Sequence, residues 1–439
     1  MKTCAFITLG CKVNQYETQA IRESLAAKGF IETTPEKPAD LYVINTCTVT
    51  SVSDEKSRHY IRKIKRKNPA STVVVTGCYA EAEVEAVKKM EGVDFVITKS
   101  EEPRLADIVS NRDGKSRFGR EIKNMPSDEN SIFDLKISNF KGHTKAFLKI
   151  EDGCDVYCSY CIIPYVRGSV RSRSLKDIKE EAERLIQNGY KEIILTGIHL
   201  GAYGKDTSRK HHLLDVIYML SNLSGFERLR LSSIEVNEIT NELIEFVACS
   251  KKMCPHFHIP LQSGDDFILK RMNRKYTASQ YLEILANIRS KIDLPSLTTD
   301  VMVGFPGEKD VHFENTISLC KKAGFSRMHI FSFSSRDGTP AARMPDHCSP
   351  QAIKQRKTKL ETVANNLAFA YKEQFLNKPA EVLVEAERDA KTNKLCGYSE
   401  RYIRVLFDGT DTMKNTIVFV RVEDANPSFC TGTLSDSVR

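Results

Sequence analysis

The sequence predicts an α/β protein in three parts: an N-terminal doubly wound parallel sheet, a central open (β/α)6 partial barrel and a small C-terminal all-β barrel. Three observations support this fold class. Short β-rich runs alternate with helical patterns in two separate stretches of the 439 residues, which is typical of parallel β-α units. The second stretch holds six such units, too few for a closed eightfold barrel. The last stretch alternates as strands without helices between them.

The patterns divide the chain into four segments. Residues 1–107 form the N-terminal part, with strands expected at 3–8, 41–45, 72–76 and 95–98 and helices at 16–28 and 54–67. Residues 108–140 are polar and weakly patterned, which indicates a linker. The partial barrel takes 141–370, with strands expected at 146–150, 192–196, 228–232, 256–260, 299–303 and 327–333 and helices at 175–188, 213–223, 241–250, 278–291 and 311–323. The small barrel takes 371–439, with strands expected at 380–387, 402–407 and 416–422.

The composition of the chain excludes some classes of protein. No apolar run reaches the roughly 18 residues that cross a membrane, and the apolar stretch at the N-terminus is too short for a secretion signal. We therefore expect a cytoplasmic protein without a membrane partner. The net charge of +8 is compatible with a polyanionic partner without identifying one. Thirteen cysteines in such a chain indicate metal ligands or buried thiols more than disulfides.

The strongest motif is a group of three cysteines in eight residues, Cys154, Cys158 and Cys161, after the first strand of the barrel. Active-site loops of barrel enzymes lie at that end of the strands. Three thiolates can hold three irons of a 4Fe–4S cluster and leave the fourth iron open. An open iron can chelate S-adenosylmethionine, and electron transfer then yields a 5′-deoxyadenosyl radical. The alternatives are buried structural cysteines or zinc, although zinc usually needs a fourth ligand in paired spacing.

This motif resembles the radical S-adenosylmethionine superfamily. The resemblance implies binding roles for residues that follow predicted strands. Tyr160 is expected near the adenine, Thr196 and Gly197 near the methionine amine, and Ser233 and Glu235 near the ribose or the amino-acid end, while Val303 and Gly304 are expected behind the adenine. An ordinary turn role is the alternative at each position, because Gly and Ser are common in turns.

A second group of cysteines, Cys11, Cys47 and Cys78, is dispersed in sequence but shares one context. Each follows a β-rich run, and the spacings of 36 and 31 residues are each close to one β-α-β unit. Successive parallel units bring the carboxyl ends of their strands to one edge of the sheet. The sequence therefore predicts a second 4Fe–4S cluster at that edge, and three separate buried cysteines are the alternative. The other seven cysteines lack such a context and are expected to be core or surface thiols.

Together these features resemble the methylthiotransferase family over nearly the whole chain. The motifs that carry the resemblance are Asn45-Thr-Cys47, Gly77-Cys78, the first cysteine group, Pro260-Leu-Gln-Ser-Gly264 and Gly304-Phe-Pro-Gly-Glu308. It implies two S-adenosylmethionine molecules, one to methylate a sulfur on the second cluster and one to make the radical. It also implies an external electron donor and a tail domain, called TRAM, that binds tRNA. A radical route suits the C2–H bond of adenine, which has no useful acidity for acid–base catalysis. We expect a monomer.

The substrate is expected to be threonylcarbamoyladenosine beside the anticodon of tRNA. The stretches 195–204, 167–173 and 230–235 resemble the family branch that acts on it. Branches that act on isopentenyladenosine in tRNA or on a ribosomal protein are the alternatives. The substrate carboxylate would favour arginine partners. The substrate-binding candidates are Arg167, Arg171, Arg173 and His199. For the arginines, a solvated basic loop is the alternative.

The predicted helix 54–67 carries seven lysines and arginines and is either a phosphate-binding face or a solvated one. In the tail, Arg401 and Arg404 are candidates for phosphate contacts, and Tyr398 and Tyr402 for base stacking. A histidine pair, His256 and His258, is expected to be structural or to face the substrate. A rival class, a non-catalytic iron–sulfur sensor or RNA-binding module, has no use for a three-cysteine group with an open iron.

Overall fold

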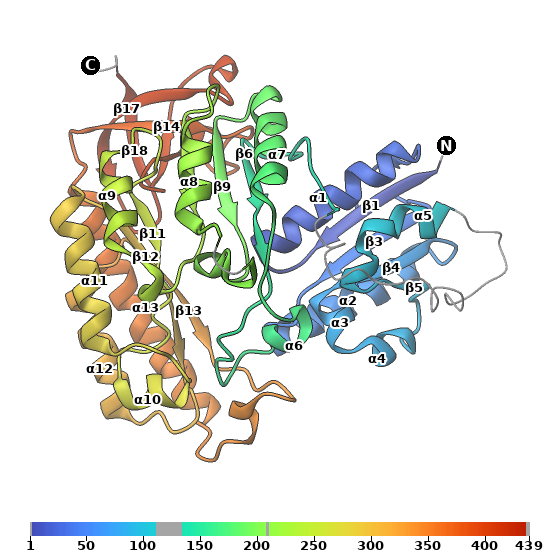
Figure 1. Ribbon diagram of the computed structural model, residues 1–439, viewed down its shortest axis with the longest axis horizontal. Coiled ribbons are helices and arrows are strands. Elements are labelled where there is room, and N and C mark those ends of the chain that lie inside the picture. Colours follow the sequence, from blue (N-terminus) through green and yellow to red (C-terminus); the bar gives the residue numbers. More distant parts are fainter. Residues whose placement is uncertain (1, 111–133, 208–209, 436–439) are drawn as a thin grey trace.

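The computed structural model describes residues 2–110, 134–207 and 210–435, and it confirms the predicted fold: two α/β parts followed by an all-β barrel (Figure 1). The N-terminal sheet contains β1 (Thr3–Thr8), β2 (Ile31–Glu32), β3 (Leu41–Thr46), β4 (Thr72–Gly77) and β5 (Phe95–Val96). The strands are parallel in the order β2-β1-β3-β4-β5. The helices of this part are α1 (Lys12–Ala27), α2 (Ser51–Lys67), α3 (Cys78–Ala82), α4 (Val84–Lys88) and α5 (Leu105–Ser110).

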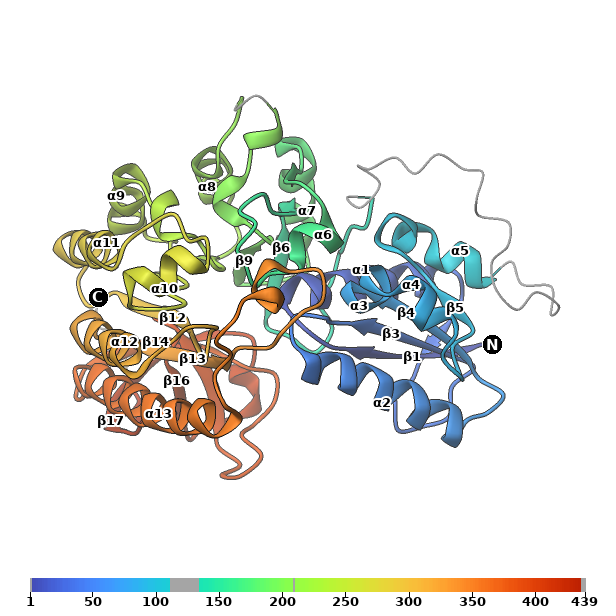
Figure 2. The ribbon, with the colours of Figure 1, turned by 90° about the horizontal axis from the view of Figure 1, so that it is seen from below.

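Successive side chains of a buried strand point to opposite faces of the sheet, which explains why helices cover both faces. Phe6 and Val43 pack with α1 and α5 on one face, whereas Ala5 and Ile44 pack with α2 on the other. Figure 2 shows α1 and α2 on opposite sides of the sheet. A sheet covered on both faces reads as continuous apolar runs, as Leu41–Thr46 does. This is the doubly wound arrangement that the sequence predicts.

The central part is an open barrel of six parallel strands. They are β6 (Lys145–Lys149), β9 (Glu192–Thr196), β10 (Arg228–Leu231), β11 (His256–His258), β12 (Ser296–Val303) and β13 (Arg327–Ser332). Parallel bridges between β10 and β11 join two three-stranded sheets into one curved surface. The outer helices are α7 (Leu175–Gln187), α8 (Leu213–Ser221), α9 (Asn241–Cys249), α11 (Ala278–Lys291), α12 (Asp310–Ala323) and α13 (Pro350–Glu373). Between the strands lie the short helices α6 (Ile163–Arg167) and α10 (Asp266–Arg271) and the hairpin of β7 (Glu151–Asp152) and β8 (Arg171–Ser172).

The C-terminal part is a closed barrel, in the order β14-β15-β16-β18-β17. Its strands are β14 (Pro379–Val384), β15 (Leu395–Ser399), β16 (Arg404–Phe407), β17 (Ile417–Ala425) and β18 (Cys430–Leu434). It closes the amino-terminal end of the central strands. There Arg230 donates hydrogen bonds to the Ser399 and Glu400 carbonyls. Tyr402 stacks between His256 and Tyr398. The two tyrosines therefore pack at an internal junction instead of forming an open stacking surface.

The predicted linker lies mainly at 111–133, outside the described residues. Its last residues pack against both neighbouring parts. Leu135, Ile137 and Phe140 are buried in the core that the sheet and the barrel share. The Tyr16 hydroxyl donates to the Leu135 carbonyl at 3.0 Å. Among the helices that the structure describes, none is both long and apolar enough to span a membrane.

Candidate active site

Cys154, Cys158 and Cys161 lie in one loop between β7 and α6, at the carboxyl end of the barrel strands. Backbone hydrogen bonds hold the loop in place. The Cys154 amide donates to the Gly168 carbonyl at 3.0 Å and the Cys161 amide to the Cys158 carbonyl at 2.9 Å. The amide of Ser159 donates to the Met272 carbonyl at 3.0 Å, which ties the loop to the end of α10. The sequence order and this anchoring bring the three thiols together.

Arg274 is the charged group beside this triad, and sequence reasoning missed it. Its Nη1 lies 3.3 Å from Cys158 Sγ, and its Nη2 pairs with Glu235. Burial raises the pKa of Cys158, and the guanidinium acts in the opposite direction. Burial also raises the pKa of Cys161, to about 12. A buried cation next to buried thiols favours their ionised form, which is the form that binds metal.

The structure places His199 beside the same triad. The imidazole Nε2 lies 2.9 Å from Glu238 Oε1, and the backbone amide of His199 donates to Glu151 Oε2 at 2.8 Å. Burial alone would lower the pKa of His199. The nearby Cys154 and Glu238 outweigh burial and raise the pKa of His199 to about 10. His199 thus lies close enough to the cysteine loop to interact with it electrostatically.

The residues predicted to bind S-adenosylmethionine follow strands at this same end of the barrel. Thr196 is the last residue of β9 and Val303 the last of β12, and both are buried. Ser233 follows β10 and bridges to His258. Gly304 has φ +78°, and its amide donates to Glu308 Oε2 at 2.8 Å. A methyl group on Gly197 would overlap the Glu151 carboxylate. The structure brings these positions to the face of the barrel that carries the cysteine loop.

The second cysteine group occupies the carboxyl ends of three adjacent strands. Cys11 caps α1 after β1, Cys47 follows β3, and Cys78 begins α3 after β4. A Cβ on Gly10 would lie 2.9 Å from Cys47 Cβ and 3.2 Å from its Sγ, so only glycine leaves room there. Burial raises the pKa of Cys47, and it raises that of Cys78 to about 11. A charge on Cys11 raises both values, so the three thiols are close enough to interact.

Asparagine side chains hold the loops of this second triad. Asn14 Nδ2 donates to the Leu9 carbonyl at 3.0 Å and to the Thr46 carbonyl at 2.9 Å, the residues near Cys11 and Cys47. Asn45 Nδ2 donates back to the Asn14 carbonyl at 3.0 Å. The Thr46 hydroxyl donates to the Thr76 carbonyl at 2.5 Å, which links the loop of Cys47 to that of Cys78. Each strand end is therefore bound to its neighbour.

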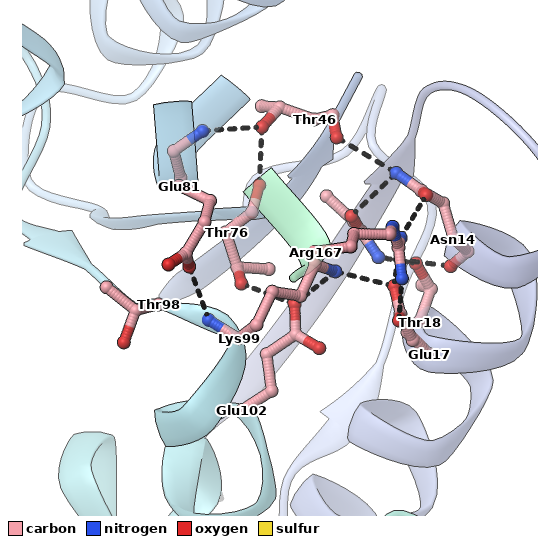
Figure 3. Close-up of polar contacts among 12 residues, drawn as sticks. Asn14, Glu17, Thr18, Thr46, Thr76, Glu81, Thr98, Lys99, Glu102 and Arg167 are labelled. Carbon is pink, nitrogen blue, oxygen red and sulfur yellow. Dashed lines mark hydrogen bonds and ion pairs between the residues drawn. The ribbon is translucent and has the colours of Figure 1, made fainter. Parts of the chain in front are cut away.

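Arg167 connects the two triads. It ends α6, which starts two residues after Cys161, and its guanidinium enters the N-terminal part (Figure 3). Nη1 lies 3.0 Å from Glu17 Oε1 and 3.0 Å from Asp152 Oδ2, and Nη2 donates to Asn14 Oδ1 at 3.0 Å. Lys99 pairs with Glu17 from the other side at 2.6 Å. The positive charges of Arg167 and Lys99 lower the pKa of Cys78, in opposition to burial.

The arginines predicted to bind the substrate thus have other partners. Arg167 and Arg173 are buried, and Arg173 Nη2 pairs with Glu181 at 2.6 Å. Arg171 is half-buried, and its Nη2 donates to the Arg167 carbonyl at 2.6 Å. The alternative of a solvated loop is therefore wrong for Arg167 and Arg173. Their burial in ion pairs gives them a role in holding the site together.

A cavity of about 200 Å³ lies between the two triads. The barrel supplies Tyr160 and Cys161 to its wall, and the N-terminal part supplies Val49 and Thr50, just after Cys47. Further lining residues are Ile162, Ile163, Gln262, Asp300, Met302, Phe331, Ser332 and Ser334. The Tyr160 ring packs edge-on against Phe305. A molecule in this cavity would touch the loops of both cysteine groups.

One further group borders the cavity. His258, Asp300 and His329 come from β11, β12 and β13, and their nearest nitrogen and oxygen atoms lie within 4.8 Å of one another. This spacing would suit a divalent cation. However, Asp300 already pairs with His258 through Oδ2 at 3.2 Å and with His329 through Oδ1 at 3.1 Å. These contacts account for the arrangement as hydrogen bonding around Asp300, the one member of the group that lines the cavity.

The fold and the cysteine loop define a radical S-adenosylmethionine enzyme. Residues 148–320 match the family described as "Radical SAM superfamily", and residues 3–98 match "Uncharacterized protein family UPF0004". The structure is similar in fold to a solved radical S-adenosylmethionine methyltransferase, TsrM from Kitasatospora setae. The TM-score is 0.54 at 14% identity, over 78% of this chain and 77% of that chain.

Two curated relatives show which family of radical S-adenosylmethionine enzymes the chain resembles. The chain is 39% identical to the threonylcarbamoyladenosine tRNA methylthiotransferase MtaB of Bacillus subtilis (strain 168), over 96% of this chain and 94% of the relative. It is 32% identical to the tRNA-2-methylthio-N(6)-dimethylallyladenosine synthase of Pelotomaculum thermopropionicum, over 99% and 98%. The chain belongs to the tRNA methylthiotransferase family. It therefore uses S-adenosylmethionine and a 4Fe–4S cluster.

Proposed function

We propose that the protein adds a methylthio group to carbon 2 of N6-threonylcarbamoyladenosine at position 37 of tRNA. In this proposal Cys154, Cys158 and Cys161 hold one 4Fe–4S cluster, and Cys11, Cys47 and Cys78 hold a second. Of the two relatives above, the one at higher identity carries threonylcarbamoyladenosine in its name. The alternative is the same reaction on the isopentenyl (dimethylallyl) adenosine of tRNA, which the second relative supports, or on a ribosomal protein residue.

The observation that carries the proposal is the cavity between the triads. One wall includes Cys161 and the other follows Cys47, so a base held there would meet both loops. Each triad offers three thiols near a buried cation, Arg274 in one case and Arg167 in the other. This donor set suits an iron–sulfur cluster with an open iron. When bound, the first cluster would provide the electron that cleaves S-adenosylmethionine, and the second would carry the sulfur that is methylated.

The chain's own residues then position the reactants. We propose that Tyr160, Thr196, Gly197, Ser233, Glu235, Val303 and Gly304 hold S-adenosylmethionine at the barrel end, with Arg274 fixing Glu235. Arg167 and Arg173 would act through their ion pairs, by holding α6 and β8 in register with α1 and α7. Arg171 and His199 complete the proposed substrate side. Excluding water from this cavity protects a radical from side reactions.

The remaining features belong to the same proposal. The partners are the anticodon stem-loop of tRNA and an external electron donor, and the protein acts as a monomer in the cytoplasm, where its tRNA substrate is found. The domains are 1–107, 141–370 and 371–439, joined by the linker 108–140. Because α13 extends to Glu373, the last boundary falls inside a helix that packs on both parts.

Mass spectrometry of tRNA nucleosides from cells that lack this protein tests the substrate. We expect the methylthio form of threonylcarbamoyladenosine to disappear and the unmodified nucleoside to accumulate. Restoring the gene should restore the product. Loss of the methylthio form of isopentenyladenosine would support the alternative, and an unchanged profile would refute both tRNA substrates.

Two cysteine variants test the separate roles of the two cysteine triads. Cys158→Ala should lose about half of the roughly eight irons of two clusters and should no longer form 5′-deoxyadenosine on reduction. Cys47→Ala should also lose about half of the iron, yet keep that cleavage and fail to insert sulfur. Cys249→Ala is the control. This exposed thiol lies on α9, and it is far in sequence from both triads. A Cys47→Ala enzyme that still thiolates tRNA would refute the second cluster.

A further inference from the structure

Two exposed tyrosines flank the first cysteine loop. Tyr157 immediately precedes Cys158, and Tyr165 lies in α6. The two residues are 46% and 55% exposed, whereas tyrosine usually has an intermediate degree of burial. The ring centroids are 5.8 Å apart and the rings meet edge to face at 79°. The pair therefore forms a preorganised aromatic surface that the described part of the chain leaves exposed.

The backbone of Tyr157 is in an unfavourable conformation. Its φ of +51° lies in the left-handed region that glycine adopts freely and a bulky side chain rarely does. Asn273 holds it there, with Nδ2 donating to the Tyr157 carbonyl at 2.9 Å. Burial of the ring cannot compensate for this strain, because the ring is half exposed. Strained residues that persist without a packing reason are concentrated at functional sites.

Tyr165 places the pair next to the cavity that has Cys161 in its wall. Tyr165 follows Ile162 and Ile163, which line that cavity. Tyr165 also lines an adjoining cavity of about 430 Å³, which shares Ile162 with the first and includes Arg58 of α2. Two more exposed apolar side chains, Val49 and Phe331, line the central cavity. Exposed apolar surface thus gathers where a substrate base must enter.

We propose that Tyr157 and Tyr165 stack on an unpaired base of the tRNA anticodon loop, next to the target adenosine. This inference rests on the proposed function. When the target base occupies the cavity, each neighbouring nucleotide is joined to it by one phosphodiester link and must lie over the rim. Proteins recognise unpaired RNA by stacking splayed bases on exposed aromatic rings.

The charges of α2 suit the same partner. Thr50 caps this helix and lines the cavity, so α2 leads directly away from the entrance. Lys65 is engaged by Asp94 at 2.8 Å, and Arg58 donates to the Tyr79 hydroxyl at 3.3 Å. The other basic residues of the helix are exposed: Lys56, Arg62, Lys63, Arg66 and Lys67. The row of exposed cations begins near the cavity. It can therefore contact the phosphates of the RNA strand whose base stacks on the tyrosines.

Fluorescence anisotropy with a labelled anticodon stem-loop that contains threonylcarbamoyladenosine tests the proposal on the full-length, cluster-loaded protein. Tyr157→Ala and Tyr165→Ala should each raise Kd roughly 5- to 150-fold, the range found for loss of one base stack. Tyr157→Phe and Tyr165→Phe keep the ring and should bind within about twofold of the wild type. Tyr218→Ala is the matched control, because Tyr218 is also 46% exposed and packs edge to face on Phe246, but on the outer helices.

An RNA with an abasic nucleotide beside the target locates the contact. The wild type should bind this RNA as weakly as Tyr165→Ala binds the intact one, and combining the two changes should add little. Wild-type affinity in both alanine variants, or an equal loss in Tyr218→Ala, would overturn the stacking proposal alone. If the wild-type protein does not bind the stem-loop, the proposed function fails first and this inference fails with it. Thermal unfolding and iron content of each variant identify any that misfold.

Discussion

Arg167 of α6 and Glu17 of α1 form an ion pair, 3.0 Å between Nη1 and Oε1, in which each side chain is only 1% exposed. Glu17 lies six residues after Cys11, and Arg167 lies six residues after Cys161. The pair therefore links two segments that each lie close in sequence to a cysteine group. Asp152 and Lys99 extend it into a buried network that spans both parts of the molecule.

Replacing Arg167 should loosen the junction between the triads. Arg167→Ala leaves Glu17 and Asp152 with one cation fewer in a buried site, and removing one partner of such a pair costs about 3–5 kcal/mol. Urea unfolding of the cluster-loaded protein measures the loss. Lys136→Ala is the control, because its pair with Asp177 is exposed and should contribute less than about 1 kcal/mol. Equal stability of the two variants would show that the buried pair does not hold the junction.

Gly77 sets the position of Cys78. Its φ is +92°, and a methyl group there would overlap the Asn45 side chain and the Thr46 backbone. Gly77→Ala should therefore displace the loop of the second triad, lower the iron content by about half and destabilise the protein by roughly 3 kcal/mol or more. Gly29→Ala is the control that measures the cost of a side chain at positive φ without steric overlap. Gly29 also has a positive φ, +81°, but its surroundings are open, so we expect a cost of about 1–2 kcal/mol and full iron content. Full iron content in Gly77→Ala would contradict the assignment.

Much of this architecture follows from local patterns. Parallel strands that end in cysteines must place those cysteines at one sheet edge, so Cys11, Cys47 and Cys78 could be grouped from sequence alone. The six barrel strands were predictable because short β-rich runs alternate with helical patterns along this stretch. The short strands Leu395–Ser399 and Cys430–Leu434 were missed, because a central glycine in each weakens the strand pattern. Helix α13 was missed because its buried face mixes small and charged residues (Arg356, Ala364, Ala368 and Lys372) and so gives a weak apolar pattern.

The charges around the site were not predictable. Arg274 contacts Cys158 across 116 residues of sequence, and Arg167 contacts Glu17 across 150. No local pattern marks such pairs, because any arginine in a polar stretch could equally be solvated. The basic stretch 167–173 suggested a substrate contact, whereas burial turns two of its arginines inward. Which charges meet is decided by how the parts dock.

Glu151 should make stability depend on pH. Burial, with the neighbouring charge of Asp152, raises the pKa of this carboxyl to about 8. Its ordinary value is about 4.3, so between these two pH values the folded protein holds a proton that the unfolded chain has lost. The free energy of unfolding should therefore fall by about 1.4 kcal/mol per pH unit as the pH rises toward 8, and level off above it.

Glu151→Gln removes this titration while keeping an oxygen that can accept from the His199 amide, as Oε2 does at 2.8 Å. Relative to the wild type, the variant should gain roughly 2 kcal/mol of stability between pH 6 and pH 8. Urea unfolding at the two pH values measures the difference, and other titrating groups cancel in the comparison. A difference that is constant with pH would mean that Glu151 is ionised in the folded protein.

Because the backbone of Tyr157 is strained, a variant at this position can separate an effect on protein stability from an effect on RNA binding. Glycine adopts a φ of +51° without the Cβ contact that costs other residues about 1–2 kcal/mol, so Tyr157→Gly should unfold at the same or a higher temperature than the wild type. Tyr165→Gly has the opposite backbone effect, because this residue is inside α6, where glycine costs about 0.5–1 kcal/mol. Both variants lose the exposed ring and should bind the anticodon stem-loop equally weakly. Calorimetry and anisotropy on the same samples compare the two effects. A large loss of stability in Tyr157→Gly would mean that the tyrosine ring supports the cysteine loop, and its exposure would then need another explanation.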